Sequence, residues 1–239
     1  DLVRSRGLGD VYKRQVLNDY DSYLQKLEQQ LAKKEKELAQ ISDEVSESRQ
    51  KSAVKLVSEI KSALNDLNFL DVQFDMQFDR LPDYTANGID APEFLISTNP
   101  GEPLKPLGKV ASGGELSRIM LGIKTIMAEN DHIESLIFDE IDSGISGRTA
   151  QMVSEKMNEL GRNHQIICIT HLPQIAAMAD AHFLIEKAVE NKSTVSRIRR
   201  LTDNDSVAEL ARMLGGAKIT DTVMESAREM KALAMEKKI

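Results

Sequence analysis

The chain has 239 residues, of which 41% are hydrophobic and 29% charged, a composition typical of a folded globular protein of one or two domains. No run approaches the ~18 apolar residues of a membrane span, the start does not resemble a secretory signal, and the single cysteine, Cys168, excludes a disulfide framework. These three features predict a cytoplasmic protein without a membrane partner. The net charge of −7 argues against a surface that coats DNA over its whole area.

Residues 1–15 differ in character from the rest of the chain. Within them, residues 10–15 read Asp-Val-Tyr-Lys-Arg-Gln, which is what a common sequencing-library adapter encodes when it is translated. We predict that residues 1–15 are a non-native scar and leave them out of the fold reasoning. On this interpretation the natural protein extends further upstream.

A heptad pattern begins at residue 16 and continues to about residue 50, with polar residues between the apolar ones. Its seam consists of Leu17, Tyr20, Leu24, Leu27, Leu31, Leu38, Ile41 and Val45. The pattern favours a coiled-coil arm over one amphipathic helix that lies on a domain. Residues 16–66 are therefore predicted to form the arm and a helical lead-in, and the exposed seam of a single arm helix needs a partner helix.

The period changes after Leu67. Val72, Phe74 and Met76 alternate with polar residues, which indicates a half-buried strand. Asn87-Gly88 is a turn signal, residues 93–97 are predicted to be a return strand, and a loop rich in proline and glycine follows.

The next segments alternate between helix and strand patterns. We predict a helix from residue 115 to about 129, a strand at 135–138, a helix at 147–160 and a strand at 165–169. This order predicts an α/β domain over residues 67–239, with a parallel sheet and helical crossovers. Three further elements follow: a hairpin of residues 182–187 and 194–201 that turns at 190–192, and helices at about 205–214 and 220–236.

Residues 111–118 read Ala-Ser-Gly-Gly-Glu-Leu-Ser-Arg at the start of a predicted helix. Gly113 and Gly114 let backbone N–H groups approach an anion, Ser112 adds a hydroxyl, and Glu115 in the first turn suits the helix dipole. We predict a cap that contacts phosphate. For Ser-Gly-Gly alone, a plain glycine-rich turn is the alternative, but the full stretch closely matches the signature motif of ABC-type ATPases.

An acidic pair, Asp139 and Glu140, ends the predicted strand at 135–138. Ligands of open α/β sheets bind at such strand ends; one carboxylate can hold Mg²⁺ and the other can polarise a water. A strand that merely ends in an acidic loop is the alternative. The position of the pair after the Ser-Gly-Gly-Glu helix resembles ABC-type ATPases, and residues 142–146, beginning with Asp142, resemble their D-loop.

His171 directly follows the last predicted strand of the parallel sheet. A structural histidine at a sheet edge is the alternative, but its place after the acidic pair resembles the switch histidine of the same superfamily, which contacts the γ-phosphate. His132, His164 and His182 have no metal-ligand spacing, so we interpret them as structural.

The densest basic cluster consists of Arg197, Arg199 and Arg200. It is a candidate DNA contact, but we favour a solvated hairpin edge whose arginines oppose aggregation.

The phosphate-binding sequence G-x-x-x-x-G-K-[ST] is absent from the chain. In SMC-type proteins this Walker A loop lies in an N-terminal half, separated from the signature half by a coiled coil. A transporter ATPase subunit carries both on one short domain, with no heptads just upstream.

Longer stretches resemble the RecN family of bacterial DNA-repair proteins, which are SMC-like ATPases, from about residue 16 to the end. These stretches are residues 96–107, 109–118, 138–147, 170–174 and 210–216. The resemblance implies the C-terminal lobe of a P-loop NTPase head, with an arm segment before it, in a protein that repairs DNA double-strand breaks by recombination.

The resemblance also implies how the site works. ATP lies between two heads of a homodimer, where it is contacted by Ser112, Gly113, Gly114, Glu115 and Asp142. Asp139 holds Mg²⁺, Glu140 acts as the base and His171 senses the γ-phosphate. The expected partners are the N-terminal half that carries Walker A, a second head, and DNA ends at the bacterial nucleoid. The chain alone is then expected to be inactive as an ATPase. Two alternatives are a non-catalytic coiled-coil interaction fragment and an ABC transporter ATPase subunit.

Overall fold

The computed structural model describes residues 2–110, 112–128, 133–190, 193–216 and 218–238, and the side chains of these residues except 2–15, 17–18, 188–190 and 193. Several predicted features therefore lie outside the described residues. They are Ala111, the helix end near residue 129, His132, the turn residues Asn191 and Lys192, and the side chain of the seam residue Leu17.

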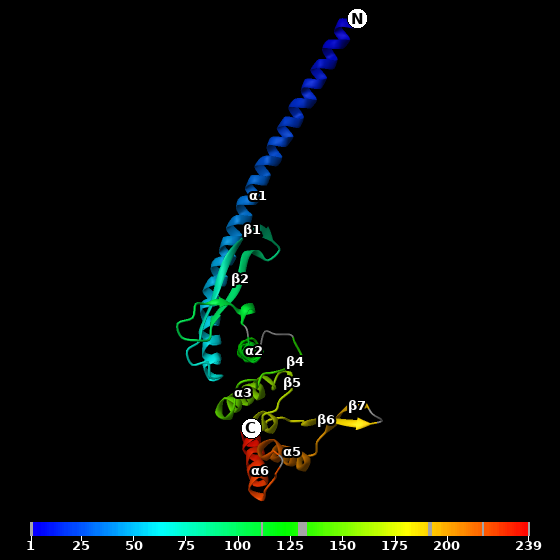
Figure 1. The fold of residues 1–239 in the computed structure, drawn as a ribbon. Coiled ribbons are helices and arrows are strands. Elements are labelled where there is room, and N and C mark those ends of the chain that lie inside the picture. The colour runs from blue at the N-terminus through cyan, green and yellow to red at the C-terminus, as the bar shows by residue number, and fades with distance from the viewer. Residues whose placement is uncertain (1, 111, 129–132, 191–192, 217, 239) are drawn as a thin grey trace. The chain divides into compact units, whose positions relative to one another are not determined.

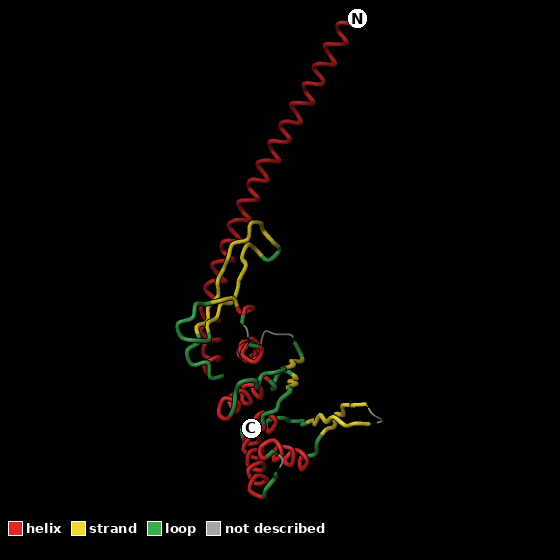
Figure 2. The backbone as a smooth tube through the Cα atoms, in the orientation of Figure 1, coloured by secondary structure: helices red, strands yellow, loops and turns green. Residues whose placement is uncertain are grey.

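Helices and strands alternate along most of the chain (Figures 1 and 2). Their order is α1 (Leu2–Asp66), β1 (Gln73–Thr85), β2 (Gly88–Ser97), β3 (Lys105–Pro106), the 3₁₀ helix η1 (Leu107–Lys109), α2 (Gly113–Met127), β4 (Ser135–Phe138), α3 (Gly147–Leu160), β5 (Gln165–Cys168), α4 (Pro173–Ala177), β6 (Phe183–Glu190), β7 (Ser193–Arg200), α5 (Asp203–Gly215) and α6 (Asp221–Glu236). None of the helices that the structure describes has the length and apolar surface that a bilayer crossing requires.

The chain divides into two compact units, of which the first comprises Asp1–Val54 and Phe78–Pro92. Within it, the buried carboxylate of Asp90 accepts a hydrogen bond from the Ser46 hydroxyl at 2.6 Å and pairs with Arg49 at 2.9 Å. The Ser46 hydrogen bond, with the Arg49 charge, lowers the pKa of Asp90 although desolvation opposes the shift. These bonds fasten the hairpin segment of this unit to its part of α1.

The heptad seam of α1 is open to solvent wherever its side chains are described. Tyr20, Leu31 and Ile41 are each 59% exposed, and Leu24 and Val45 are also exposed. An apolar stripe that stays in water does not stabilise its helix, because no apolar surface is buried. The exposed seam is therefore typical of one half of a coiled coil. The predicted boundary between the arm and the α/β domain stays a prediction.

The second unit comprises Lys55–Gln77 and Glu93–Ile239 and holds three apolar clusters. The first lies between the last turns of α1, the β1-β2-β3 sheet and α2. Its buried members are Ile60, Leu64, Val72, Phe74, Ile96, Ile119 and Ile123. Gly122 keeps α2 close to α1, because a β-carbon there would lie 3.1 Å from the side chain of Leu64.

The second cluster supports the parallel sheet. β4 pairs with β5 in parallel, with Leu136 opposite Ile166, and α3 is the crossover helix that covers one face with buried side chains such as Val153 and Leu160. This confirms the predicted α/β fold with a helical crossover. The strand bounds at 135–138 and the helix bounds at 147–160 agree with the prediction.

The other face of this two-stranded sheet is open. Ile137 is 70% exposed, Ile167 46% and Ile169 51%. Strands of parallel sheets are normally covered on both faces, which is why their sequences are apolar throughout. The sequences of β4 and β5 therefore match a sheet that is covered on both sides.

The third cluster is formed by α4, α5 and α6 around small side chains such as Ala177, Ala211 and Ala227. Lys231 of α6 donates to the carbonyl oxygens of Ala177 and Ala179 at 3.0 and 3.1 Å and so satisfies the end of α4. The β6–β7 hairpin is antiparallel, as predicted.

Some elements differ from the prediction. β1 and β2 extend the first hairpin through residues 79–85 and 88–92, which are polar and carry little alternation. The short elements β3, η1 and α4 were not predicted. β3 and η1 lack the continuous apolar run that indicated the short strands β4 and β5, and the five residues of α4 are too few to show a helical period.

Replacing Ile119 by alanine is expected to lower the free energy of unfolding by about 2–5 kcal/mol, because the side chain is fully buried between α1 and the sheet. The matched change Ile137→Ala, at a side chain 70% exposed, is expected to stay within about 0.5 kcal/mol of the parent. Urea denaturation of the chain measures both. Equal losses at the two positions would contradict this assignment of the core.

Candidate functional site

The signature turn opens α2. Ser112 is the N-cap, with an extended backbone (φ −95°, ψ 121°), and its hydroxyl oxygen accepts from the backbone N–H of Glu115 at 3.4 Å. Serine at this position satisfies one of the free N–H groups of the first turn. Glu115 then places a negative charge where the helix dipole favours it.

The two glycines of this turn are required by a close approach. A β-carbon on Gly114 would lie 2.9 Å from the carbonyl oxygen of Glu140 and 2.9 Å from the β-carbon of Ser143. A β-carbon on Gly113 would lie 2.6 Å from Oε2 of Glu140. The predicted phosphate cap therefore lies directly against Glu140, the predicted catalytic base.

Two side chains of α2 bind the same strand end. The hydroxyl of Ser117 donates to the carbonyl oxygen of Asp139 at 3.0 Å. Nη1 of Arg118 donates to the carbonyl oxygens of Ile141 and Ser143 at 3.3 and 3.0 Å. Arg118 is only 7% exposed, and this burial lowers the pKa of its guanidinium while the charge of Glu115 opposes the shift.

The acidic pair is exposed at the carboxyl end of β4, as predicted. Oδ1 of Asp139 accepts from the backbone N–H of Glu140 at 2.9 Å. Glu140 has φ +57°, a left-handed conformation that costs a non-glycine residue on the order of 1–3 kcal/mol. Such backbone strain concentrates at functional positions, which agrees with a special role for Glu140.

Asp142, in the turn after β4, is hydrogen-bonded to the segment after β5 that carries His171. Asp142 is 4% exposed, and its Oδ2 accepts from the Thr170 hydroxyl at 2.6 Å and from the backbone N–H of His171 at 2.8 Å. Nδ1 of His171 lies 3.0 Å from the same oxygen, while the side chain of His171 remains 72% exposed.

Cys168 lies at the end of β5 with a partly buried thiol. Burial, together with the negative charges of Asp142 and Asp139, raises the pKa of its thiol to about 12. The thiol therefore stays protonated and belongs to the apolar cluster beneath the sheet.

The donor set around Asp139 fits Mg²⁺ rather than a tightly caged metal. Among the described residues there is no cluster of three or more histidine, cysteine, aspartate or glutamate side chains. Mg²⁺ usually keeps several waters and takes only one or two carboxylates together with substrate phosphates. The exposed carboxylate of Asp139 beside the predicted phosphate cap is compatible with that requirement.

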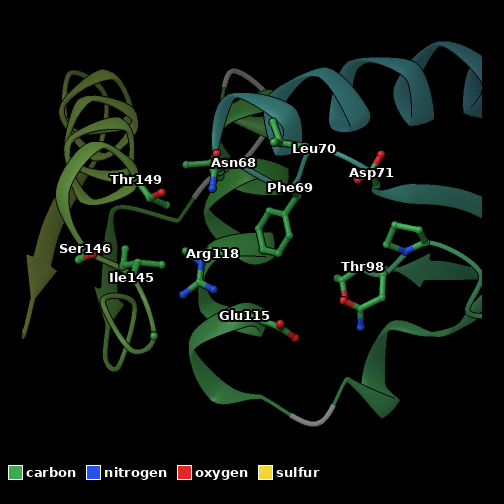
Figure 3. A pocket seen from close by; sticks show the side chains of 14 residues that line it. Asn68, Phe69, Leu70, Asp71, Thr98, Glu115, Arg118, Ile145, Ser146 and Thr149 are labelled. Atoms are coloured by element: carbon green, nitrogen blue, oxygen red, sulfur yellow. The ribbon is translucent and has the colours of Figure 1, made fainter.

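A pocket of about 530 Å³ opens beside α2 (Figure 3). Its lining includes Glu115 and Arg118, the segment after α1, and residues 144–146 of the turn that follows the acidic pair. The guanidinium of Arg118 lies over the ring of Phe69, 5.6 Å from its centroid. Any group that enters this pocket contacts the helix that carries the predicted phosphate cap.

Comparison with known proteins places the chain. It is 42% identical over 229 residues to the DNA repair protein RecN of Bacillus subtilis (strain 168). The aligned region covers 90% of the chain and 40% of that relative. It is 40% identical over 189 residues to RecN of Vibrio cholerae, covering 79% of the chain and 34% of the relative. The chain belongs to the RecN family.

The RecN match concerns one part of a longer protein, because the chain spans about 40% of the length of the Bacillus subtilis relative. RecN of Treponema pallidum is 47% identical over 143 residues, covering 60% of the chain and 25% of the relative. No protein-family model matches the chain.

Structural comparison supports the same fold. The Smc head domain with a coiled coil and joint from Pyrococcus yayanosii superposes with a TM-score of 0.50 at 20% identity, covering 68% of the chain and 29% of that structure. This likeness shows the fold, an α/β lobe of an SMC-type head.

The structure thus brings the sequence-predicted residues into two neighbouring groups. The signature turn lies against Asp139 and Glu140, and Asp142 binds the segment of His171. The prediction missed the roles of Arg118 and Thr170. For Arg118, the sequence offered one signal of a structural role, a charged residue directly before the apolar Ile119. No sequence feature indicated that Thr170 would bind Asp142. The role of each site residue toward a ligand stays a prediction.

Replacing Gly114 by alanine is expected to destabilise the chain by about 1–3 kcal/mol, because the new methyl group meets backbone atoms that cannot move aside easily. Gly113→Ala is expected to cost less, since it displaces only the flexible end of Glu140. Urea denaturation measures both.

Gly108→Ala is the matched control, because a β-carbon there meets nothing within 4 Å. It is expected to leave stability unchanged or to raise it by up to ~1 kcal/mol. Equal effects at Gly108 and Gly114 would show that the two segments do not approach each other as described.

Proposed function

We propose that the chain is the signature-bearing half of an ATP-hydrolysing head in a protein that repairs DNA double-strand breaks by recombination. The observation that carries the proposal is the join between the signature turn and the acidic strand end, where Gly113 and Gly114 lie against Glu140. The identity to DNA repair proteins named RecN supports the biological setting.

In this proposal ATP lies between two heads of a homodimer. Ser112, Gly113 and Gly114 offer a hydroxyl and backbone N–H groups to the γ-phosphate of ATP bound on the opposite head, with Glu115 beside them. Bound Mg²⁺ neutralises phosphate charge, and Asp139 is the residue that would hold it. Glu140 polarises the attacking water. His171 contacts the γ-phosphate from the end of β5.

The open face of the β4–β5 sheet is the proposed docking surface for the N-terminal half that carries the Walker A loop. Three exposed isoleucines lie there, at positions 137, 167 and 169. A groove of about 300 Å³ between α2 and β4 continues the surface, and its lining includes Leu116, Met120 and Ile137. Covering this face would give the parallel strands the two-sided burial that their sequences suit.

The open seam of α1 is the proposed contact with the returning helix of the same arm. By analogy with SMC-like proteins, closure of the heads on ATP moves the arms and changes their grip on DNA ends. The protein then acts in the bacterial cytoplasm at the nucleoid. Arg199 pairs with Glu186 at 3.7 Å and with Asp205 at 3.6 Å, and these carboxylates reduce the positive charge of the arginine cluster that was the candidate DNA contact.

A second candidate function is a non-catalytic fragment that works through its coiled coil, and the exposed seam favours it. Co-expression with an N-terminal half separates the two, since only the ATPase head gains ATP turnover. The third alternative, a transporter subunit, predicts a membrane partner, and the heptads before the signature turn argue against it.

The chain assembled with the N-terminal half of the Bacillus subtilis relative is expected to hydrolyse ATP. Glu140→Gln should lower kcat by about 10²–10⁴-fold, because an amide cannot take a proton from water. Phosphate release under steady-state conditions measures this change.

Glu134→Gln is the matched control at the opposite end of β4, where the side chain is exposed and outside the site. It should leave kcat unchanged. Wild-type turnover in the Glu140→Gln assembly would remove the base role assigned to Glu140.

Ile137→Asp is expected to weaken co-purification of the chain with a tagged N-terminal half, because a charge would be buried at the docking surface. Its effect on the stability of the isolated chain should be small, since the side chain is 70% exposed there. Leu233→Asp, at a side chain 52% exposed on α6, is the control and should co-purify normally. Undiminished capture of the Ile137→Asp chain would place the docking surface elsewhere.

A further inference from the structure

The carboxylate of Asp142 is surrounded by donors from one short segment. One oxygen, Oδ2, accepts from the Thr170 hydroxyl at 2.6 Å and from the backbone N–H of His171 at 2.8 Å. The same oxygen lies 3.0 Å from Nδ1 of His171. All of these groups belong to Thr170 and His171, in the segment after β5, while Asp142 belongs to the turn after β4.

This arrangement bears on which nitrogen of the neutral His171 ring carries its proton. Nδ1 lies 3.0 Å from Oδ2 of Asp142, and a carboxylate offers only acceptors, so a proton on Nδ1 stabilises this approach whereas a lone pair there would repel the oxygen. The ring is held from its Nδ1 side, and the side chain of His171 is 72% exposed. Its Nε2 is therefore the nitrogen left to meet a ligand.

Asp142 itself is poorly placed to meet a ligand. Its side chain is 5% exposed, and its oxygen is occupied by groups of the same chain. The Thr170 hydroxyl that donates to it also accepts from the backbone N–H of Leu172 at 3.0 Å. The hydrogen bonds thus continue from Asp142 along the main chain that carries His171.

We propose that Asp142 is a positioning residue that sets the tautomer and orientation of His171, and that it does not contact nucleotide. Asp142 lies against Nδ1 and the backbone N–H of residue 171, so that Nε2 is the ring nitrogen left for a ligand. The inference rests on the proposed function only in taking the γ-phosphate of ATP as the group that Nε2 contacts. It replaces the nucleotide contact that the resemblance to ABC-type ATPases implies for Asp142.

A carboxylate suits this task better than a neutral amide. Hydrogen bonds to an ionised acceptor are roughly twice as strong as those between neutral groups. An asparagine would place an N–H₂ group beside donors such as the Thr170 hydroxyl whenever its amide turned. The ionised carboxylate therefore holds the hydroxyl, the backbone N–H and the ring more strongly than an asparagine would.

The first experiment needs no nucleotide and uses the chain itself. Long-range ¹H–¹⁵N correlation spectra of histidine-labelled chain report which ring nitrogen is protonated. In the wild type, the neutral ring of His171 is expected to carry its proton on Nδ1. In Asp142→Ala, it should revert to the Nε2–H tautomer that free histidine prefers.

His182 is the internal control, because its Nδ1 lies 2.9 Å from the Ser206 hydroxyl and its signals should not change. Asp83→Ala removes an exposed carboxylate of β1 and is the matched variant, with no expected effect on His171. A wild-type His171 ring already protonated on Nε2, or an Asp142→Ala ring still protonated on Nδ1, would overturn the proposal.

The second experiment uses the chain assembled with the N-terminal half of the Bacillus subtilis relative. Asp142→Ala should lower kcat by about 10–10²-fold, as expected for a misplaced group, with the KM for ATP within about twofold. The double variant with His171→Ala should be no slower than His171→Ala alone, because both changes remove one function.

The outcomes separate this inference from the proposed function. A large kcat loss in His171→Ala with none in Asp142→Ala would overturn the positioning role while the proposed function stands. If His171→Ala leaves kcat unchanged, the proposed role of His171 fails and the catalytic part of this inference fails with it. The tautomer measurement decides the structural part in either case.

Discussion

The contact between the Gly113–Gly114 turn and the end of β4 is the constraint on which the site depends. The two segments approach so closely that a β-carbon on Gly114 would meet backbone atoms, and one on Gly113 would have to displace the end of the Glu140 side chain. Ser117 and the buried Arg118 join the same two segments through carbonyl oxygens. The predicted phosphate cap and the acidic strand end are thereby held close together.

Two apolar surfaces of the chain are open, and each suits a different partner. The seam of α1 has the spacing of a coiled coil, and the face of β4 and β5 has the apolar content of strands covered on both sides. The exposure of these two apolar surfaces agrees with a chain that spans about 40% of the length of its Bacillus subtilis relative. The proposed N-terminal half would cover both, and it would bring the lysine-bearing loop that this sequence lacks.

The sequence predicted those parts of the fold that carry a clear period or a strong motif. α3 has the predicted bounds because its apolar residues recur at helical spacing, and β4 because its short apolar run ends at an acidic pair. The five-residue helix α4 and the long hairpin of β1 and β2 were missed or shortened, because tertiary pairing rather than local pattern forms them. The partners of Asp142 were also beyond reach, since Thr170 lies 28 residues further along the chain.

The central claim is that the signature turn of one head serves ATP bound to another. Mixing two inactive assemblies tests this most directly: one carries Ser112→Arg, and the other lacks the phosphate-loop lysine of its N-terminal half. If the turn acts across the dimer, the mixture should regain ATP turnover. Each mixed dimer then has one ATP site that is intact, formed by the phosphate loop of the Ser112→Arg assembly and the signature turn of the assembly that lacks the lysine. A mixture that stays as inactive as its two components, while the mixed dimers form, would contradict the account.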